Sequence, residues 1–398
     1  MNEPHAVTQP PVTTVHLVYP HGPSIATPDA IGRKVGERLE RTYRVVHHDW
    51  NARYGIRPRP DEALVGHPHP LPGTVFRRSS RAGGWGRVLM LAPFVDDPIQ
   101  VAFVDSIIGN CDLFLAITGP YWNSRIGGSQ WSHWKPKMVR VDLAVDRADF
   151  PPLKTGFNLP GQRRFVYIGH KGHFKNTPYL GEIARSLPGV EFAWIGPDSQ
   201  ELPGVATLGG QDFSTTAARQ LVAGFDFLIT VGRADANPTT ILEAMAWGLI
   251  PVCSPQSGYQ GVSGIVNVPL DDVTGVATVI RELQEMSDAD LRRMQQENWD
   301  RLDRNFTWDR FAAQVVGAIE STDTPALGPA SGLRRLRLSW AAATSSQTSP
   351  WRDLRRLARA QLRAWARSAA GRRREGSVAR SSRGPDEGGP AAHDGGAG

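Results

Sequence analysis

The sequence predicts an α/β protein with two doubly wound parallel-sheet domains that face a cleft, followed by a basic tail. Short apolar segments alternate with helical stretches along most of the chain, which is the pattern of parallel strands joined by right-handed crossovers. The chain has 398 residues. A single hydrophobic core stops growing at roughly 250 to 300 residues, so a chain of this length is expected to form more than one domain. The excess positive charge lies at one end only, which indicates a segment appended to a globular body.

The first domain is expected over residues 1–149. Its predicted strands are the apolar segments 12–20, 43–50, 63–68, 87–95, 112–119 and 137–145. A helix is predicted at 28–42, because Pro28 suits a helix start and Ile31, Val35 and Leu39 recur at helical spacing. A second helical stretch covers 99–111.

The second domain is expected over residues 150–324, after an interdomain linker at 150–164 that contains Pro and Gly. Its predicted strands are 165–170, 191–197, 204–209, 225–232, 249–254 and 264–268. The predicted helices between and after them are 179–187, 215–224, 239–248, 273–286 and 307–322, the last of which is expected to close this domain. Ligands of open α/β sheets bind at the carboxyl ends of the strands, so two such domains would form a cleft walled by strand-end loops.

The tail, residues 325–398, accounts for the net charge of +6, which arises from 45 Lys+Arg against 39 Asp+Glu. From Ala326 onward there are 14 Arg, no Lys and 5 acidic residues, so the tail carries +9 and the rest of the chain −3. In a helix predicted at about 351–370, Arg residues surround one apolar face, made of Trp351, Leu354, Ala358, Leu362, Trp365 and Ala369. Such a helix suits an anionic membrane surface. A disordered tail, a helix docked on the body and a nucleic-acid contact are the alternatives, and the acidic body makes nucleic acid an unexpected partner.

The cysteine content and the first residues of the chain favour a cytoplasmic protein. Peripheral association with the inner face of the cell membrane is a further prediction, based on the tail. The 2 Cys of the chain cannot form a disulfide framework, which favours a reducing environment. Residues 1–15 have neither the basic nor the apolar region of a signal peptide, and no apolar run approaches the ~18 residues of a membrane span.

Segment 230–258 carries the most informative chemistry. A strand leads through a short loop to Asn237 and Pro238, which we expect to be the N-cap and first residue of the next helix. The N–H groups of Thr239 and Thr240 would then point outward at the positive end of the helix dipole, where a phosphate binds favourably.

Two carboxylates flank this helix start. Asp235 precedes the helix, and Glu243 lies about one turn inside it, on the side of the two threonines. A carboxylate there can accept hydrogen bonds from the hydroxyls of a sugar attached to a phosphate.

These residues resemble a known family. The run DANPTTILE, continued by AMAWGLIPVCSPQSG, is similar to the E-x7-E motif and adjoining helix and strand of retaining GT-B glycosyltransferases of the group 1 or family 4 type. Upstream, FVYIGHKGHFKNTPYLGEIARSLPGVEFAWIGPD resembles the opening of that family's nucleotide-sugar domain. The resemblance covers roughly Val141 to Glu320, while the first half matches only in its order of strands and helices.

The resemblance implies a set of site residues. The catalytic residues implied are Asp235, Lys175 and His170. Asp235 would lie by the transferred sugar, and Lys175 and His170 would neutralise the donor diphosphate. The donor-binding residues implied are Gly169, Asn237, Thr239, Thr240, Glu243, Gly258, Gly22 and His67. Gly22 matches the place of a glycine-rich loop on the acceptor side, although a glycine needed only for a turn explains it equally, and His67 with His69 can also be plain loop histidines.

The chain departs from the family pattern at two of these positions. The first carboxylate of the motif is Asp235 rather than Glu, which retracts it by about one methylene group. The first basic residue is His170 rather than Arg, and a histidine is fully charged only at acidic pH.

No metal site is expected. The spacing of His67 and His69 allows a metal, but no further ligand lies near them in sequence. Asp288 and Asp290 have the D-x-D form of metal-dependent sugar transferases of another fold, yet a helix N-cap and first turn explain them better. No G-x-G-x-x-G follows a strand, which disfavours a nicotinamide enzyme.

The sequence therefore predicts a glycosyltransferase that moves a sugar from a nucleotide-diphosphate sugar to a glycan or lipid-linked acceptor, with retention and without a metal or other cofactor. A non-catalytic nucleotide-sugar-binding or scaffold protein and a sugar-nucleotide epimerase of the same fold are the alternatives. The sequence does not predict which base and which sugar the donor carries, or which acceptor molecule receives the sugar.

Overall fold

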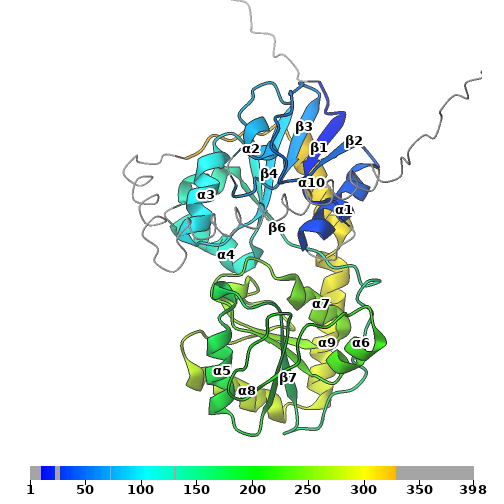
Figure 1. Cartoon of the computed structure of the whole chain (residues 1–398), viewed down its shortest axis with the longest axis vertical. Coiled ribbons are helices and arrows are strands. Elements are labelled where there is room, and N and C mark those ends of the chain that lie inside the picture. Colours follow the sequence, from blue (N-terminus) through cyan, green and yellow to red (C-terminus); the bar gives the residue numbers. More distant parts are fainter. Residues whose placement is uncertain (1–9, 23–26, 72, 130, 329–398) are drawn as a thin grey trace, which may run out of the picture. The chain divides into compact units, whose positions relative to one another are not determined.

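The computed structural model describes residues 10–22, 27–71, 73–129 and 131–328 (Figure 1). Within them the chain forms two six-stranded sheets in which the paired strands are all parallel. This confirms the predicted architecture of two doubly wound domains. The arginine-rich tail, with the helix expected at about 351–370, lies outside the described residues. None of the helices in the described ranges is long and apolar enough to span a bilayer.

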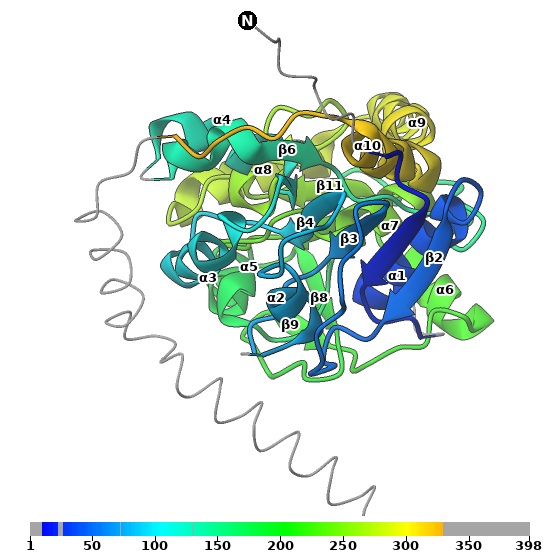
Figure 2. The same ribbon diagram turned by 90° about the horizontal axis from the view of Figure 1, so that it is seen from above.

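The first sheet has the strand order β2-β1-β3-β4-β5-β6, and Figure 2 shows β2, β3, β4 and β6 following one another in this order. Its strands are β1 (Thr14–Val18), β2 (Arg44–His48), β3 (Glu62–Gly66), β4 (Arg87–Pro93), β5 (Leu113–Ile117) and β6 (Met138–Val141). Each coincides with one of the predicted apolar segments. Such runs are nearly continuous in apolar residues because helices cover both faces of a parallel sheet.

The helices of this half are α1 (Thr27–Leu39), α2 (Val75–Ser79), α3 (Pro98–Ile108) and α4 (Gly119–Arg125), with the short 3-10 turns η1 (Ile126–Gly128) and η2 (Ser132–Lys137). Alternate residues of β1 and β4 point to opposite faces. Leu17 and Leu89 share a core with Val35 of α1, whereas Val18 and Met90 share a core with α2, α3 and the turns that follow α4. The sequence predicted α1 and α3 but not α2 or α4.

The second sheet has the order β12-β11-β10-β7-β8-β9. Its strands are β7 (Arg164–Ile168), β8 (Glu191–Ile195), β9 (Val205–Thr207), β10 (Phe227–Thr230), β11 (Ile250–Cys253) and β12 (Val266–Asn267), and its helices are α5 (Thr177–Ser186), α6 (Thr216–Ala223), α7 (Thr239–Trp247), α8 (Val273–Glu285) and α9 (Asp288–Asn305). Phe165 and Tyr167 of β7 pack with α5 and α8. Val166 and Ile168 face the other way and join α6, α7 and α9 in the same apolar core that contains α1.

The last helix, α10 (Trp308–Glu320), forms where the sequence predicts it but packs on the first sheet rather than closing the second. Asp309 accepts a hydrogen bond of 2.8 Å from Arg38 Nε of α1. The buried guanidinium of Arg87, at the start of β4, donates to the Ala318 carbonyl at 3.1 Å. This buried cation needs acceptors, and the carboxyl end of α10 supplies them. The domain boundaries at residues 150 and 325 remain predictions.

The segment that crosses between the two sheets is fixed by a buried ion pair. Lys154 Nζ lies 2.9 Å from Asp226 Oδ1, and both side chains are buried. The N–H groups of Leu153 and Lys154 also donate to the carbonyl of Trp247 at 2.9 Å. The crossing chain is thereby tied to the end of α7, the helix that carries the predicted motif.

Candidate active site

The strand order of the second sheet reverses between β7 and β10, and the loops that follow these two strands leave the sheet on opposite sides. In open α/β sheets the crevice at such a reversal is where ligands bind. The loop after β7 contains Gly169, His170 and Lys175, and the loop after β10 contains Asp235. The topology therefore brings the predicted catalytic residues to one place.

Lys175 and Asp235 meet directly at this crevice. Lys175 ends the 3-10 turn η3 (His173–Lys175), and its Nζ forms an ion pair with Asp235 Oδ2. Both side chains are partly exposed, at 21% and 18% of their surface, so a ligand can reach either of them. A cation and a carboxylate thus stand side by side at the end of the strands.

Gly169 and His170 lie on the same loop with different surroundings. A Cβ atom at Gly169 would lie 2.9 Å from Tyr167 Oη, so a larger residue there would have to displace the Tyr167 hydroxyl. His170 is exposed, and its carbonyl accepts a hydrogen bond of 3.1 Å from the Tyr167 hydroxyl. Its imidazole and the Lys175 side chain both lie against Gly172, since a Cβ there would be 3.5 Å from His170 Nε2 and 3.3 Å from Lys175 Cγ.

The start of α7 differs by one residue from the prediction. Pro238, with extended backbone, is the N-cap, and the helix begins at Thr239. Asn237 does not cap the helix, because its Oδ1 accepts a hydrogen bond of 2.9 Å from the N–H of Leu143. Its buried Nδ2 has no partner among the described residues. The first N–H groups of α7, from Thr239 and Thr240, still lack partners within the helix, as at any helix start.

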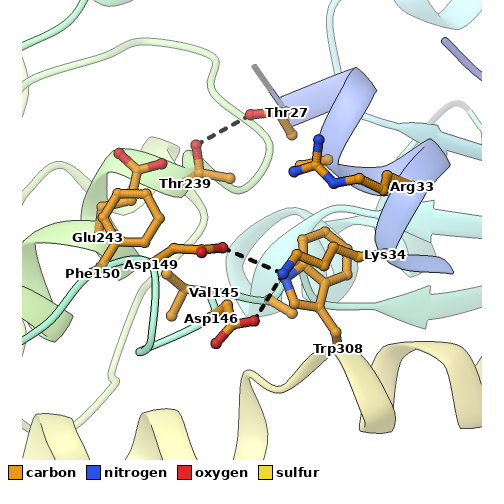
Figure 3. A pocket seen from close by; sticks show the side chains of 12 residues that line it. Thr27, Arg33, Lys34, Val145, Asp146, Asp149, Phe150, Thr239, Glu243 and Trp308 are labelled. Atoms are coloured by element: carbon orange, nitrogen blue, oxygen red, sulfur yellow. Dashed lines mark hydrogen bonds and ion pairs between the residues drawn. The ribbon is translucent and has the colours of Figure 1, made fainter. Parts of the chain in front are cut away.

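Glu243 lies one turn inside α7, beside Thr239 (Figure 3). Burial raises the pKa of the Glu243 carboxyl to about 7, and a hydrogen bond with the Thr239 hydroxyl opposes this shift. The Glu243 carboxyl therefore holds its proton to a higher pH than an exposed glutamate does.

The amino end of α1, from the first half, reaches the same place. Thr27 Oγ1 lies 3.2 Å from Thr239 Oγ1. These residues, with Arg33 and Lys34 of α1, line a small cavity that also contains Glu243 (Figure 3). Lys34 Nζ is bound there by Asp146, at 2.8 Å, and by Asp149, at 3.3 Å. The site is thus built from both halves of the chain, which spacing along the sequence does not reveal.

His67 and Gly22 lie at the corresponding reversal of the first sheet, between β1 and β3. The ring of His67 packs against Tyr19 and Trp50. Its Nδ1 accepts a hydrogen bond of 3.0 Å from the N–H of His69, and burial, aided by His69, lowers the pKa of His67 to about 3. The ring is therefore neutral, with its hydrogen on Nε2.

Gly22 donates its N–H to Asp29 Oδ1 at 3.1 Å and accepts a hydrogen bond of 3.1 Å from Arg33. These contacts hold the loop after β1 against α1. The structure thus gives Gly22 a local structural role, in the contact between this loop and α1. Its predicted role on the acceptor side stays a prediction.

Gly258 lies at a point where the two halves meet. Its φ is +91°, and a Cβ atom would lie only 2.3 Å from the carbonyl oxygen of Ala236. Gly119 of α4 is opposed to it, since a Cβ at Gly119 would lie 2.5 Å from the Gly258 carbonyl oxygen. Both positions require glycine, because no other residue fits this contact between main chains.

Apart from Gly22 and His67, the sequence did not predict the residues that the first half contributes, chiefly Thr27, Lys34 and Trp122. Trp122 of α4 donates its indole N–H to main-chain carbonyls of Asp235 and Gln256, each at 3.1 Å. The available signal was the run Thr118-Gly119-Pro120 directly after a strand, which resembles a helix start with proline in its first turn. In the ranges that the structure describes, no group of three or more His, Cys, Asp or Glu side chains is arranged to hold a metal ion.

Comparison with known proteins gives a match in structure but not in sequence. No protein-family model matches this chain, and no curated protein sequence does. Sucrose-phosphate synthase from Thermosynechococcus elongatus superposes with a TM-score of 0.56 at 15% identity, over 76% of this chain and 97% of that one.

Two further solved structures are similar at 12% identity. One is α,α-trehalose 6-phosphate synthase from Burkholderia multivorans, with a TM-score of 0.50 over 66% of this chain and 72% of that one. The other is a trehalose-6-phosphate protein of E. coli bound with UDP-2-fluoro glucose, with a TM-score of 0.51 over 67% of this chain and 74% of that one. At these identities the likeness establishes the fold, and the predicted GT-B architecture is confirmed.

Proposed function

We propose that this protein is a glycosyltransferase that takes a nucleotide-diphosphate sugar as donor and passes the sugar to a glycan or lipid-linked acceptor. One observation carries the proposal. At the strand reversal of the second sheet, Lys175 and Asp235 meet beside the amino end of α7, whose next turn presents Glu243. The GT-B architecture, shared with the sugar-phosphate synthases described above, supports the same conclusion.

The leaving group is the nucleoside diphosphate, and its developing negative charge needs stabilisation. Lys175 supplies a positive charge, and the N–H groups of Thr239 and Thr240, which have no partner within the helix, supply the positive end of a helix dipole. Such preorganised groups act strongly where water is excluded. His170, on the same loop as Lys175, adds a second N–H donor. Side-chain cations and helix N–H groups together supply the charge that a metal ion supplies elsewhere, so we propose transfer without a metal.

The two carboxylates would bind different parts of the donor. Asp235, paired with Lys175, would lie beside the transferred sugar, and its other oxygen can accept a hydrogen bond from a sugar hydroxyl. Glu243 lies deeper along α7, where it can accept hydroxyls of the nucleotide ribose. The buried Nδ2 of Asn237, which has no partner among the described residues, is available to an oxygen of the donor.

The acceptor would enter from the first sheet, past Gly22, and His67 would lie near the donor sugar. The fixed tautomer of His67 gives a neutral N–H donor, which suits a sugar hydroxyl better than a phosphate. Retention of the anomeric configuration follows from the family resemblance and remains part of the proposal.

Incubation with a panel of nucleotide sugars tests the function. We expect donor-dependent release of UDP or GDP that falls about 100- to 1000-fold in Lys175→Ala, as expected for loss of one group that stabilises the leaving charge. Lys171→Ala is the matched control, because Lys171 lies on the same loop but is exposed and bound to Gln200. Tight nucleotide binding with no release under any acceptor would indicate the scaffold alternative. Interconversion of the sugar without an acceptor would indicate an epimerase.

We also propose that the arginine-rich tail brings the enzyme to an anionic membrane surface on the cytoplasmic side, where a lipid-linked acceptor would be found. Its composition, 14 Arg against 5 acidic residues, supports this. Flotation with vesicles of anionic lipid should recover the full chain and not a chain ending before Ser331. Equal recovery of the two would refute the role of the tail.

A further inference from the structure

The loop that carries Asp235 has no regular secondary structure, and its shape depends on a few hydrogen bonds. The N–H of Asp235 donates to the carbonyl of Gln256 at 3.0 Å. The carbonyl of Asp235 accepts the indole N–H of Trp122 at 3.1 Å. The main chain of this one residue is therefore held on both sides, which fixes the direction in which its carboxylate leaves the loop.

The indole of Trp122 holds a second loop at the same point. Its N–H is shared with the carbonyl of Gln256, also at 3.1 Å. Gln256 belongs to the turn η4 (Pro255–Ser257), which leads into Gly258. A single donor from the first half thus joins the loop after β10 to the loop after β11.

The ring of Trp122 is seated rather than loosely placed. It is only 7% exposed and packs with Val95 of the first half and Ala236 of the second. Next to it, the N–H of Tyr121 donates to the carbonyl of Gly258 at 3.3 Å. The main chains of Gly119 and Gly258 approach closely at the same place, so α4 lies directly against this loop.

We propose that Trp122 is a positioning residue, which sets the orientation of the Asp235 carboxylate through the main chain and makes it depend on the docking of α4. The effect of Trp122 on turnover rests on the proposed glycosyltransferase function, whereas its effect on the loop of Asp235 does not. A catalytic group works only within about 0.5 Å of its productive place. The reach of Asp235 is one methylene shorter than that of a glutamate, so the loop itself has to bring the carboxylate forward.

The variant Trp122→Phe tests this, because phenylalanine keeps an aromatic ring at this place and removes the N–H, together with part of the indole that packs on Val95 and Ala236. The matched control is Trp85→Phe. Trp85 is similarly buried, at 8% exposure, and donates its indole N–H to the Ser79 carbonyl at 2.9 Å, with both residues in the first half. Both variants should remain folded, which circular dichroism and thermal unfolding verify.

We expect Trp122→Phe to lower kcat by about 2- to 10-fold, the change that one net hydrogen bond provides, with the KM of the nucleotide sugar changed less than twofold. Hydrogen exchange of the amides in 231–238 should accelerate in this variant and not in Trp85→Phe. Equal kinetics and exchange in the two variants would overturn the proposal, as would a rise in KM without a fall in kcat.

The two readouts separate this inference from the proposed function. If the wild-type protein transfers no sugar from any donor, the proposed function fails. The exchange of 231–238 then decides alone whether Trp122 holds the loop: faster exchange in Trp122→Phe supports it, and unchanged exchange refutes it.

Discussion

Replacing Glu243 by glutamine is expected to make the protein more stable and the donor site weaker. The half-buried carboxyl has its pKa raised to about 7 by burial, from an ordinary value of 4.5. In the folded protein the ionised form is therefore disfavoured, whereas in the unfolded chain it is not. Glutamine keeps the shape and the ability to bond Thr239 but carries no charge at any pH.

The size of the effect follows from the pKa. One tenfold change in an ionisation constant corresponds to about 1.4 kcal/mol, so ionised Glu243 lowers the free energy of unfolding by about 3 kcal/mol. Between pH 4.5 and about 7 the folded state binds more protons than the unfolded state, so stability falls as the pH rises through this window. Below it both states hold the proton, and above it the loss is complete.

Thermal unfolding of the wild type and of Glu243→Gln across pH 4 to 9 measures this. The two melting temperatures should coincide near pH 4 and separate by about 5 °C at pH 8, with the variant higher. Glu285→Gln, at an exposed position of α8, should show no such gap. A variant that is less stable than the wild type at pH 8 would refute the view that burial of the charge dominates at this position. Nucleotide affinity should fall in Glu243→Gln even where its stability rises.

Three further outcomes follow from other contacts. Lys154→Met should lower the free energy of unfolding by about 3 to 5 kcal/mol, because Asp226 is then buried without its cation; a loss below about 1 kcal/mol in chemical denaturation would contradict this. Gly258→Ala should abolish turnover or folding, because the φ of +91° at this position disfavours alanine and the methyl group would meet the Ala236 carbonyl oxygen at 2.3 Å. A variant with full activity and unchanged thermal stability would show that the contact does not require glycine. The imidazole of His67, whose pKa burial lowers to about 3, should show no change of charge between pH 5 and 8 by NMR and should carry its hydrogen on Nε2; a titration near pH 6 would contradict its buried, neutral state.

The elements that the sequence predicted well are those whose pattern is local. The β-strands of both sheets show as short apolar runs, because each is buried on two faces. The helix at α7 shows through Asn237, Pro238 and the small residues that follow. Its start was wrong by one residue, since the side chain of Asn237 bonds Leu143 instead of the helix, and that partner lies 94 positions away.

The sequence by itself determined the two α/β halves, the alternation of their strands and helices, and the positions of Lys175, Asp235 and Glu243 on strand-end loops and a helix. The tertiary structure alone decided what these side chains meet. Strand order brings the loops after β7 and β10 together. The helix α10 returns to the first sheet, where its apolar face joins the core that contains α1 and its carbonyls accept from the buried Arg87. Trp122 reaches the loop of Asp235 because glycines at 119 and 258 let two main chains touch. Hydrogen bonds and steric fit act between neighbours in space, and a single sequence records only neighbours along the chain.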